Sequence, residues 1–428
     1  MKILMMILHF PPAWRGGAEL QCWKQARALA ARGHEVTILT QWWQATSLRR
    51  ELRDGVVILR LGSFVPVTMA ARRIHARLAG RHRAAAGVVS TRDPAQAFGS
   101  DAPSKQGFRW MSLTERPGIW SYMAAAGRLF QRGKLKADLI HVHESQWNAG
   151  FAQWAGEILG VPVFCKEAFQ PVLREGLAAD VPRAEEWNRR RLKCRFIAIT
   201  GDIARDLAAA GIPAERIVEV PNGVELPAAT VQPDRHSDAI YIGNFTQGAA
   251  HKGFDVLFRA WALAIRQEPA MRLQLFGRGD IDYWSRYAQE QGCGDSVVFA
   301  GQTSDVWSAH RQAGYLVLPS RVEGLSNALL EAMASGLPVV VSDIPGNLAA
   351  VTDGENGLVV PVGDAAALAV ALVRMHRSPD LRARLGQAAR ARAADTFAIE
   401  QVAARLEAAY RQAIAADAAG RAAIGIRG

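Results

Sequence analysis

Short apolar stretches alternate with longer amphipathic stretches along this chain, and that alternation limits the folds it can adopt. One series starts with apolar stretches at Ile3–Leu8 and Glu35–Thr40, separated by a helical pattern over Ala18–Arg32. A second series starts at Ala239–Ile242 and continues through a helical pattern over Phe254–Arg266. Strands that alternate with helices are typical of parallel sheets covered by helices. The sequence therefore predicts an α/β fold.

The remaining predicted elements continue the same alternation in both series. The further strands are Leu139–His143, Val161–Cys165, Phe196–Ile199, Ile217–Val220, Arg272–Phe276, Val297–Phe299, Tyr315–Leu318, Pro338–Ser342 and Gly357–Val360. The further helices are Gly150–Leu159, Ile203–Ala210, Ile281–Gln291, Val306–Ala313, Asn327–Ser335, Ala365–Met375 and Ile399–Ala415. Residues 65–117 show no regular pattern and receive no element.

A chain of 428 residues, half of them hydrophobic, favours two domains with a core each. The polar segment Pro227–Asp238 is predicted to link them. We therefore predict a first domain over residues 1–226 and a second over 239–397, with a last helix over 398–416. Two successive doubly wound units place a ligand cleft at the carboxyl ends of their strands.

The sequence also suggests the compartment in which the protein works. No apolar run reaches the roughly 18 residues of a membrane-spanning helix, and we expect Met1–Phe10 to form a buried first strand. The four cysteines, Cys22, Cys165, Cys194 and Cys293, are scattered and form no CxxC pair. Such cysteine usage is typical of a reduced cytosolic protein.

The excess of positive over negative charge is confined to the first half of the chain. Residues 1–225 carry 32 lysines and arginines against 20 acids, whereas the remainder carries 19 against 20. The densest basic stretch is Arg72–Arg83. A basic face of this kind attracts anions such as lipid headgroups, phosphorylated acceptors or nucleic acid, and a solvated arginine-rich helix without a partner is the alternative.

Two carboxylates bracket a strand-to-helix connection in the second series. The strand Tyr315–Leu318 runs into a loop with Glu323, and Glu331 follows eight residues later in the next helix. On one continuous helix the two would lie about 12 Å apart along the axis. The free N–H groups at the start of a helix attract phosphate. In this order, the first carboxylate would suit sugar hydroxyls, the amides a diphosphate, and the second carboxylate the ribose hydroxyls. The alternative is that Glu323 only caps the helix and Glu331 is solvated.

The segment from Glu323 to Val340, with Gly324 and then Glu331-Ala332-Met333-Ala334-Ser335-Gly336-Leu337-Pro338, closely resembles the donor site of retaining glycosyltransferases of family 4. Other stretches share the resemblance: Gly16-Gly17 after the first strand, His143 after another, Pro221-Asn222-Gly223-Val224-Glu225, and Lys252-Gly253. The resemblance covers nearly the whole chain and is weakest over residues 60–135. It implies the GT-B fold: two Rossmann-like domains that face each other across a cleft, with a final helix that crosses back to the first domain.

The resemblance also implies a role for each matching residue. Glu331 would hydrogen-bond the ribose hydroxyls and Glu323 the sugar hydroxyls. Lys252 and the backbone N–H groups from Gly324 to Ser326 would stabilise the departing diphosphate. Gly16 and Gly17 would face the donor phosphates, and His143 would position the sugar. The predicted catalytic residues are Glu323, His143 and Lys252, and the predicted donor-binding residues are Gly16, Gly17, Asn244, Lys252, Gly277, Arg278, Glu323, Gly324, Leu325, Ser326, Asn327 and Glu331.

The chain departs from the family pattern at one cation. Where the family has an arginine that holds the diphosphate, this sequence has Asn244. Arg15 and Arg278 are candidates to supply the missing charge. Gly277 and Arg278 belong to a turn that the resemblance places near the nucleotide.

The predicted activity is transfer of a sugar from a nucleotide-diphosphate sugar to a hydroxyl acceptor, with retention and without a metal or other cofactor. A saccharide or lipid-linked acceptor, and contact of the first domain with an anionic membrane at its inner face, would fit the basic charge and a role in surface polysaccharide assembly.

The absence of GxGxxG after the first strand counts against a nicotinamide or flavin site.

Several alternatives stay open. His141 and His143 could be structural or begin a zinc site, and Asp280-Ile281-Asp282 could bind a metal, although a helix start explains two acids there. Gly16-Gly17 could be only a tight turn, and Lys252 a surface lysine. An epimerase on the same fold is a rival function. A basic binding module for nucleic acid is another, but no nucleic-acid motif is present.

Overall fold

The computed structural model describes residues 1–11, 16–42, 47–62, 105–170, 172–173, 183–231, 237–246, 250–303 and 305–423, and the backbone alone for 105–117, 184 and 421–423. The chain divides into two compact units. The first contains Met1–Val220 and Ala403–Gly428, and the second contains Pro221–Val402. Arg15 and the basic stretch Arg72–Arg83 lie outside the described residues.

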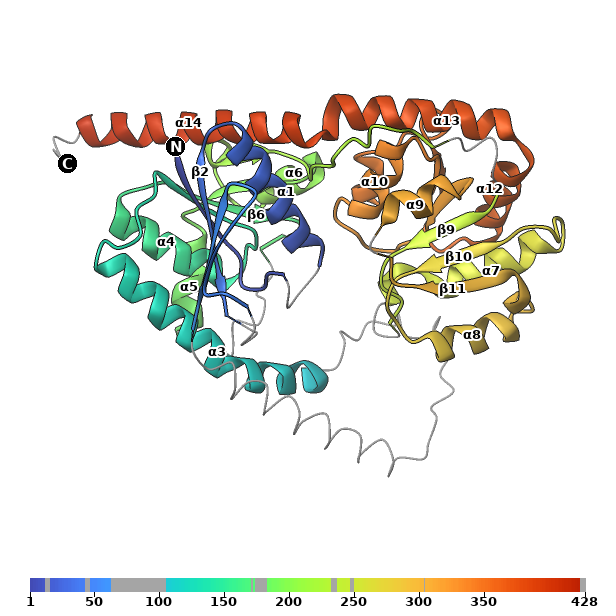
Figure 1. The fold of residues 1–428 in the computed structure, drawn as a ribbon, viewed down its shortest axis with the longest axis horizontal. Helices are drawn as coiled ribbons and strands as arrows, with labels where there is room; N and C mark the ends of the chain where they lie inside the picture. The colour runs from blue at the N-terminus through green and yellow to red at the C-terminus, as the bar shows by residue number, and fades with distance from the viewer. Residues whose placement is uncertain are drawn as a thin grey trace. The chain divides into compact units, whose positions relative to one another are not determined.

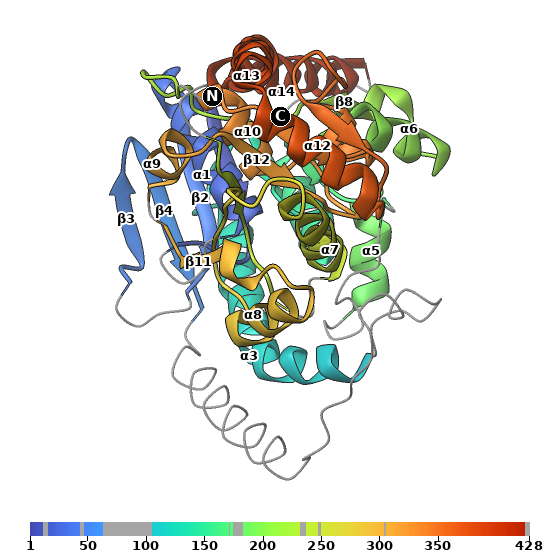
Figure 2. The ribbon, with the colours of Figure 1, turned by 90° about the vertical axis from the view of Figure 1, so that its right-hand side faces the viewer.

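The first unit is built on an eight-stranded sheet in the order β3-β4-β2-β1-β5-β6-β7-β8. All neighbouring strands are parallel except β3 and β4, which pair antiparallel at the edge of the sheet, beside β2 (Figure 2). Its elements are β1 Lys2–Met6, α1 Gly17–Ala31, β2 Glu35–Gln41, β3 Arg50–Arg53, β4 Val56–Leu61, α3 Lys105–Gln131, β5 Leu139–Val142, α4 Trp147–Leu159, β6 Val163–Glu167, α5 Ala184–Arg191, β7 Arg195–Ala198, α6 Gly201–Ala209 and β8 Ile217–Glu219.

The second unit is built on a six-stranded parallel sheet in the order β11-β10-β9-β12-β13-β14. Helices α7 and α12 pack side by side in this unit (Figure 1). Its elements are β9 Ala239–Ile242, the short 3-10 helix η4 Ala250–Lys252, α7 Phe254–Ile265, β10 Leu273–Phe276, α8 Ile281–Glu290, β11 Val297–Gly301, α9 Val306–Arg311, β12 Tyr315–Leu318, α10 Asn327–Ser335, β13 Val339–Ser342, α11 Pro345–Leu348, β14 Leu358–Val360, α12 Ala365–Arg377 and α13 Pro379–Arg392.

The last helix, α14 Ile399–Ala423, begins in the second unit, and from Ala403 onward its residues belong to the first. Within the first unit it is fixed by ion pairs, among them Arg32 to Glu407 at 2.7 Å and Arg195 to Asp417 at 2.6 Å. Within the described residues, no helix is both long and apolar enough to cross a bilayer.

The central strands explain why the α/β pattern was visible in the sequence. Each residue of β12 is at most 1% exposed, and all four residues of β13 are buried. Strands buried on both faces need continuous apolar runs, which is typical of parallel sheets between helices. The predicted bounds of β9, β12 and α10 are confirmed, and the other predicted elements agree to within a few residues, except that α14 continues to Ala423, beyond its predicted end at Ala415.

The two compact units meet a few residues before the predicted first boundary at residue 226. Pro221-Asn222-Gly223-Val224-Glu225 belongs to the second unit and does not close the first. The reason is hydrogen bonding: the N–H of Val224 donates to the Phe397 carbonyl, and the Ile399 N–H donates back to the Val224 carbonyl, at 2.8 and 2.9 Å. The segment predicted as a linker also bonds to the second unit, since the Val231 N–H donates to the Ser335 carbonyl at the end of α10 at 2.9 Å.

Candidate functional site

The loop between β12 and α10 carries Glu323, and it places this carboxylate before the helix rather than on it. Helix α10 starts at Asn327, with Ser326 in an extended backbone conformation at its N-cap. The helical spacing between Glu323 and Glu331 therefore does not apply. The loop leaves the backbone of Gly324, Leu325 and Ser326 directly ahead of the first turn of α10, where N–H groups lack helical partners. This arrangement suits an anion, as predicted.

Glu323 and Lys252, predicted to contact different parts of a donor, form an ion pair with each other. The Lys252 Nζ donates to Glu323 Oε1, and Ser320 Oγ donates to the same oxygen at 3.2 Å. The two charged side chains are 22% and 11% exposed, so the pair lies in a partly desolvated position. Lys252 ends η4, which follows β9, and Glu323 follows β12, the neighbour of β9 in the sheet. The sheet order thus brings together two residues that are 71 positions apart.

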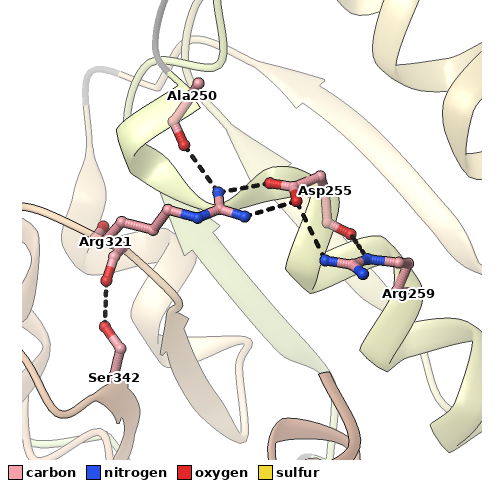
Figure 3. Close-up of polar contacts among 6 residues, drawn as sticks. Ala250, Asp255, Arg259, Arg321 and Ser342 are labelled. Carbon is pink, nitrogen blue, oxygen red and sulfur yellow. Dashed lines mark hydrogen bonds and ion pairs between the residues drawn. The ribbon is translucent and has the colours of Figure 1, made fainter. Parts of the chain in front are cut away.

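An arginine clamp holds the two loops that carry this ion pair (Figure 3). Arg321 Nη1 and Nη2 donate to the two carboxylate oxygens of Asp255, each at 2.7 Å, and Nη1 also donates to the Ala250 carbonyl at 3.0 Å. The Arg321 N–H donates to the His251 carbonyl at 2.7 Å. Asp255 lies in the first turn of α7. The clamp therefore fixes the β12 loop to η4 and to the start of α7.

Burial alone would raise the pKa of the Asp255 carboxyl. The hydrogen bonds and charge of Arg321, together with the Arg259 charge, outweigh this effect and hold the pKa below its usual value. Asp255 therefore stays ionised near neutral pH, and the clamp stays charged. Sequence patterns did not pair Arg321 with Asp255, because 66 residues separate them.

Further contacts hold the β12 loop from its other sides. Ser342, at the end of β13, donates its hydroxyl to the Ser320 carbonyl (Figure 3), and Asn347 Nδ2 donates to the Ser342 carbonyl at 3.0 Å. Asn222 Nδ2 donates to the Leu325 carbonyl at 2.8 Å, which gives the predicted Asn-Gly motif a structural role at this loop. Gly346 in α11 approaches so closely that a Cβ there would lie 2.0 Å from the Gly324 carbonyl oxygen.

Glu331 lies in the second turn of α10 and is 8% exposed. It makes a polar contact within the chain, as does Asn327 at the start of the helix. A carboxylate in this position is too buried to be a solvated residue on an amphipathic helix. Glu323 therefore lies in the loop before α10, and Glu331 lies within α10, with the start of the helix between them.

The loops after β9 and β10 carry Asn244, Gly277 and Arg278, and they pack against each other. The Phe245 N–H donates to the Arg278 carbonyl at 2.8 Å, and Phe245 pairs with Gly279 in an isolated bridge. Gly277 has φ +148°, and a Cβ there would lie 1.8 Å from the Gly243 carbonyl oxygen, so only glycine fits. Asn244 and Arg278 are both exposed. Arg278 thus lies in the loop that packs against the loop of Asn244, the position where the family has an arginine.

The Asp280-Ile281-Asp282 segment forms the start of α8, with Asp280 at its N-cap. Across the part of the chain that the structure describes, no group of three or more histidine, cysteine, aspartate or glutamate side chains is placed to hold a metal ion. Asp280 and Asp282 thus lie at the start of α8, where the positive end of the helix dipole favours acidic side chains.

In the first unit, Gly16 is the N-cap of α1 and Gly17 its first residue. Glu19 accepts backbone hydrogen bonds from Gly16 and from its own N–H. This is the glutamate half of a capping box, in which the third helical residue satisfies the N-cap N–H. Burial raises the pKa of the Glu19 carboxyl, against the opposing effect of these hydrogen bonds. The predicted Gly-Gly segment thus begins a helix in which the N–H groups of Gly16 and Glu19 donate to the Glu19 carboxylate.

His143 follows β5 directly, and its N–H donates to the Met6 carbonyl at 3.0 Å. Its ring stacks on that of His141, with centroids 4.3 Å apart, which confirms that both histidines point to the same face. Burial, as the main cause, and smaller effects of the neighbouring His141 and Lys166 lower the pKa of His143 well below its usual value. His143 is therefore a neutral, buried imidazole near neutral pH.

Comparison with known proteins identifies the family. Residues 16–223 match the family described as "Glycosyl transferase 4-like domain", and residues 236–378 match "Glycosyl transferases group 1". The phosphatidyl-myo-inositol mannosyltransferase of Mycobacterium leprae (strain TN) is 31% identical over 261 residues, which are 58% of this chain and 66% of that protein. The lipopolysaccharide core biosynthesis mannosyltransferase LpcC of Rhizobium leguminosarum bv. viciae is 30% identical over 190 residues, 43% of this chain and 53% of that protein. The matches thus span less than two thirds of either relative.

Solved structures share the fold at low identity. Sucrose-phosphate synthase from Thermosynechococcus elongatus superposes with a TM-score of 0.67 at 22% identity, over 97% of this chain and 99% of that one. HepE from Anabaena, in complex with UDP, gives a TM-score of 0.66 at 16% identity, over 96% and 100%. Since the two matched families together account for most of the sequence and both units have the expected parallel sheets, the chain belongs to the family 4 glycosyltransferases of the GT-B fold.

Proposed function

We propose that the protein transfers a sugar, with retention of its anomeric configuration, from a nucleotide-diphosphate sugar to a hydroxyl of a lipid-linked saccharide. The observation that carries this proposal is the β12 loop, where Glu323, Lys252 and the start of α10 lie together. Lys252 and the loop N–H groups would bind the diphosphate, Glu323 the sugar hydroxyls and Glu331 the ribose. Lys252 and the N–H groups offer positive charge and hydrogen-bond donors where the leaving diphosphate gains negative charge.

In the proposed step, the bond between the anomeric carbon and the diphosphate oxygen breaks. The acceptor oxygen bonds to that carbon on the same face, and the acceptor proton leaves with the diphosphate. Lys252 stabilises the charge that builds on the departing phosphate, and Arg278 is the candidate for the second cation. No protein nucleophile and no metal take part in this proposal.

The acceptor class is supported by charge and by the relatives. The excess positive charge lies in the first half of the chain, where it would attract an acceptor with a phosphate or diphosphate. The Mycobacterium leprae relative is named a phosphatidyl-myo-inositol mannosyltransferase, and the Rhizobium relative is named for lipopolysaccharide core biosynthesis. A cytoplasmic location at the inner face of a membrane belongs to the same proposal. It fits the four cysteines, all of which are free.

A transfer assay tests this function. The full chain is incubated with radiolabelled UDP-glucose or GDP-mannose in EDTA, with or without a lipid extract of the organism that makes the protein. We expect one donor to label a lipid in the extract. Label released as free sugar at the same rate with and without lipid would contradict an acceptor role, and conversion of the donor to an epimer would favour the epimerase. If neither donor is consumed, the proposal is wrong for both of these sugars.

A further inference from the structure

Helix α14 buries a tyrosine against the strands that carry the two histidines. The Tyr410 hydroxyl lies 2.6 Å from His141 Nδ1, and the Tyr410 ring packs edge-on against Phe164 with centroids 5.1 Å apart. His141 and Phe164 are register partners in β5 and β6, so they lie side by side on one face of the sheet. Tyr410 is fully buried. One side chain of the last helix therefore contacts two neighbouring strands of the first unit.

The charge states of the two partners limit how this hydrogen bond can form. Burial, reinforced by the Lys166 charge, lowers the pKa of His141 to about 3, and burial raises the pKa of the Tyr410 phenol well above its usual value. The imidazole is therefore neutral and the phenol protonated near neutral pH. If the Tyr410 O–H donates and His141 Nδ1 accepts, the imidazole proton lies on Nε2, and we take this tautomer as the hypothesis to test.

His143 has a different environment from His141. It is 3% exposed, and neither of its ring nitrogens has a hydrogen-bond partner among the described residues. A buried polar group without a partner is costly and requires an explanation, such as a ligand that supplies the partner. Its ring is oriented by stacking on His141, 4.3 Å away and inclined by 23°. The orientation of His143 thus depends on the orientation of His141.

We propose that Tyr410 and His141 are positioning residues: their hydrogen bond fixes the His141 ring, and the stack on that ring holds His143 so that one of its nitrogens faces a sugar hydroxyl of a bound substrate. This inference rests on the proposed function, because it takes a sugar-containing substrate as the ligand of His143, the contact that the sequence resemblance implies. Nothing in the sequence motifs pointed to Tyr410, which lies 269 residues from His141.

The alternative is that Tyr410 only anchors α14. An anchor would affect stability but would not set the geometry of a histidine ring. Tyr410→Phe removes the hydroxyl and keeps the packing on Phe164. Tyr122→Phe is the matched control, because Tyr122 is also a buried tyrosine of the first unit, and it packs on Phe151 rather than on the histidines.

The first readout needs no substrate. In the full chain labelled with ¹⁵N-histidine, long-range NMR spectra report the tautomer and surroundings of each ring, with assignments from His141→Asn and His143→Asn. We expect the Nε2–H tautomer for His141, and we expect Tyr410→Phe to shift the ring signals of both histidines while Tyr122→Phe leaves them in place. Unchanged His143 signals in Tyr410→Phe would overturn the inference.

The second readout uses UDP-glucose or GDP-mannose, whichever the wild type consumes. A misplaced group near the reacting atoms costs about tenfold to a hundredfold in rate, so we expect that fall in kcat for Tyr410→Phe, with the donor KM within about twofold and a Tm close to that of Tyr122→Phe. A lower Tm with unchanged kcat would show an anchor only and overturn the inference. Full activity in His143→Ala would overturn the sugar contact and, with it, this inference, whereas the proposed sugar transfer would stand.

Discussion

Replacing Glu323 with glutamine is expected to slow sugar transfer strongly and at the same time to tighten the binding of a bare nucleoside diphosphate. In the ligand-free protein, Glu323 neutralises Lys252, so a diphosphate must compete with this carboxylate for the lysine. Glutamine has nearly the same shape but no charge, and it would leave the Lys252 ammonium available. We expect transfer to fall by about tenfold to a hundredfold, because a charged hydrogen bond to the sugar is worth roughly 1.5–3 kcal/mol.

Titration calorimetry with UDP and GDP measures the second half of this prediction. We expect Glu323→Gln to bind the preferred diphosphate about three- to tenfold more tightly than the wild type, which corresponds to roughly 1 kcal/mol. Glu290→Gln, an exposed acid of the same unit, is the control and should change neither quantity. Weaker diphosphate binding by Glu323→Gln would show that the ion pair does not compete with the ligand.

The second large effect concerns the arginine clamp. Asp255→Ala would leave the Arg321 guanidinium without its carboxylate in a position where the two side chains are 17% and 6% exposed. Removing one partner of a buried ion pair costs about 3–5 kcal/mol, and the partial exposure of Arg321 favours the lower figure, about 3 kcal/mol. The loops that carry Lys252 and Glu323 would also lose their fixed spacing, so donor binding should fall with stability.

Calorimetric unfolding of the full chain measures this effect as a lower transition temperature of the second unit. Glu268→Ala is the matched control, since it breaks the exposed Arg377 pair, which should be worth at most about 1 kcal/mol. In Asp255→Leu with Arg321→Leu, neither charge remains unpaired, and we expect part of the stability to return without donor binding. Equal, small effects of Asp255→Ala and Glu268→Ala would contradict a structural role for the clamp.

The sequence predicted the central elements well because their burial dictates their composition. β12 is a run of four buried residues between a glycine and a proline, so its bounds were visible. The β3–β4 hairpin was missed, although Asp54-Gly55 is a strong hairpin signal. Both of these residues have positive φ, 48° and 77°, as the tight turn requires. Helix α3 was missed because Gly107 and Pro117 interrupt its pattern, and neither residue is favourable inside a helix.

The candidate site was predicted in its residues but not in its contacts. Glu323 and Lys252 were expected to bind different parts of a donor, and their ion pair depends on β9 and β12 being neighbours in the sheet. The Arg321–Asp255 clamp and the Tyr410–His141 hydrogen bond join residues far apart in sequence, which periodicity does not reveal. Local patterns reflect burial and backbone conformation, whereas such pairings depend on the order of the strands.

The central claim is that the second unit binds a nucleotide-diphosphate sugar through the β12 loop and α10. Thermal-shift screening of the wild type and of Glu331→Ala against UDP, GDP, ADP and dTDP, with their common sugars, tests it most directly. At 100 times its dissociation constant a ligand adds about 2.7 kcal/mol to the stability of the folded protein. We predict a clear shift with one nucleotide family in the wild type and a smaller shift in Glu331→Ala. No shift with any nucleotide in a folded wild type, or an equal shift in Glu331→Ala, would contradict the claim.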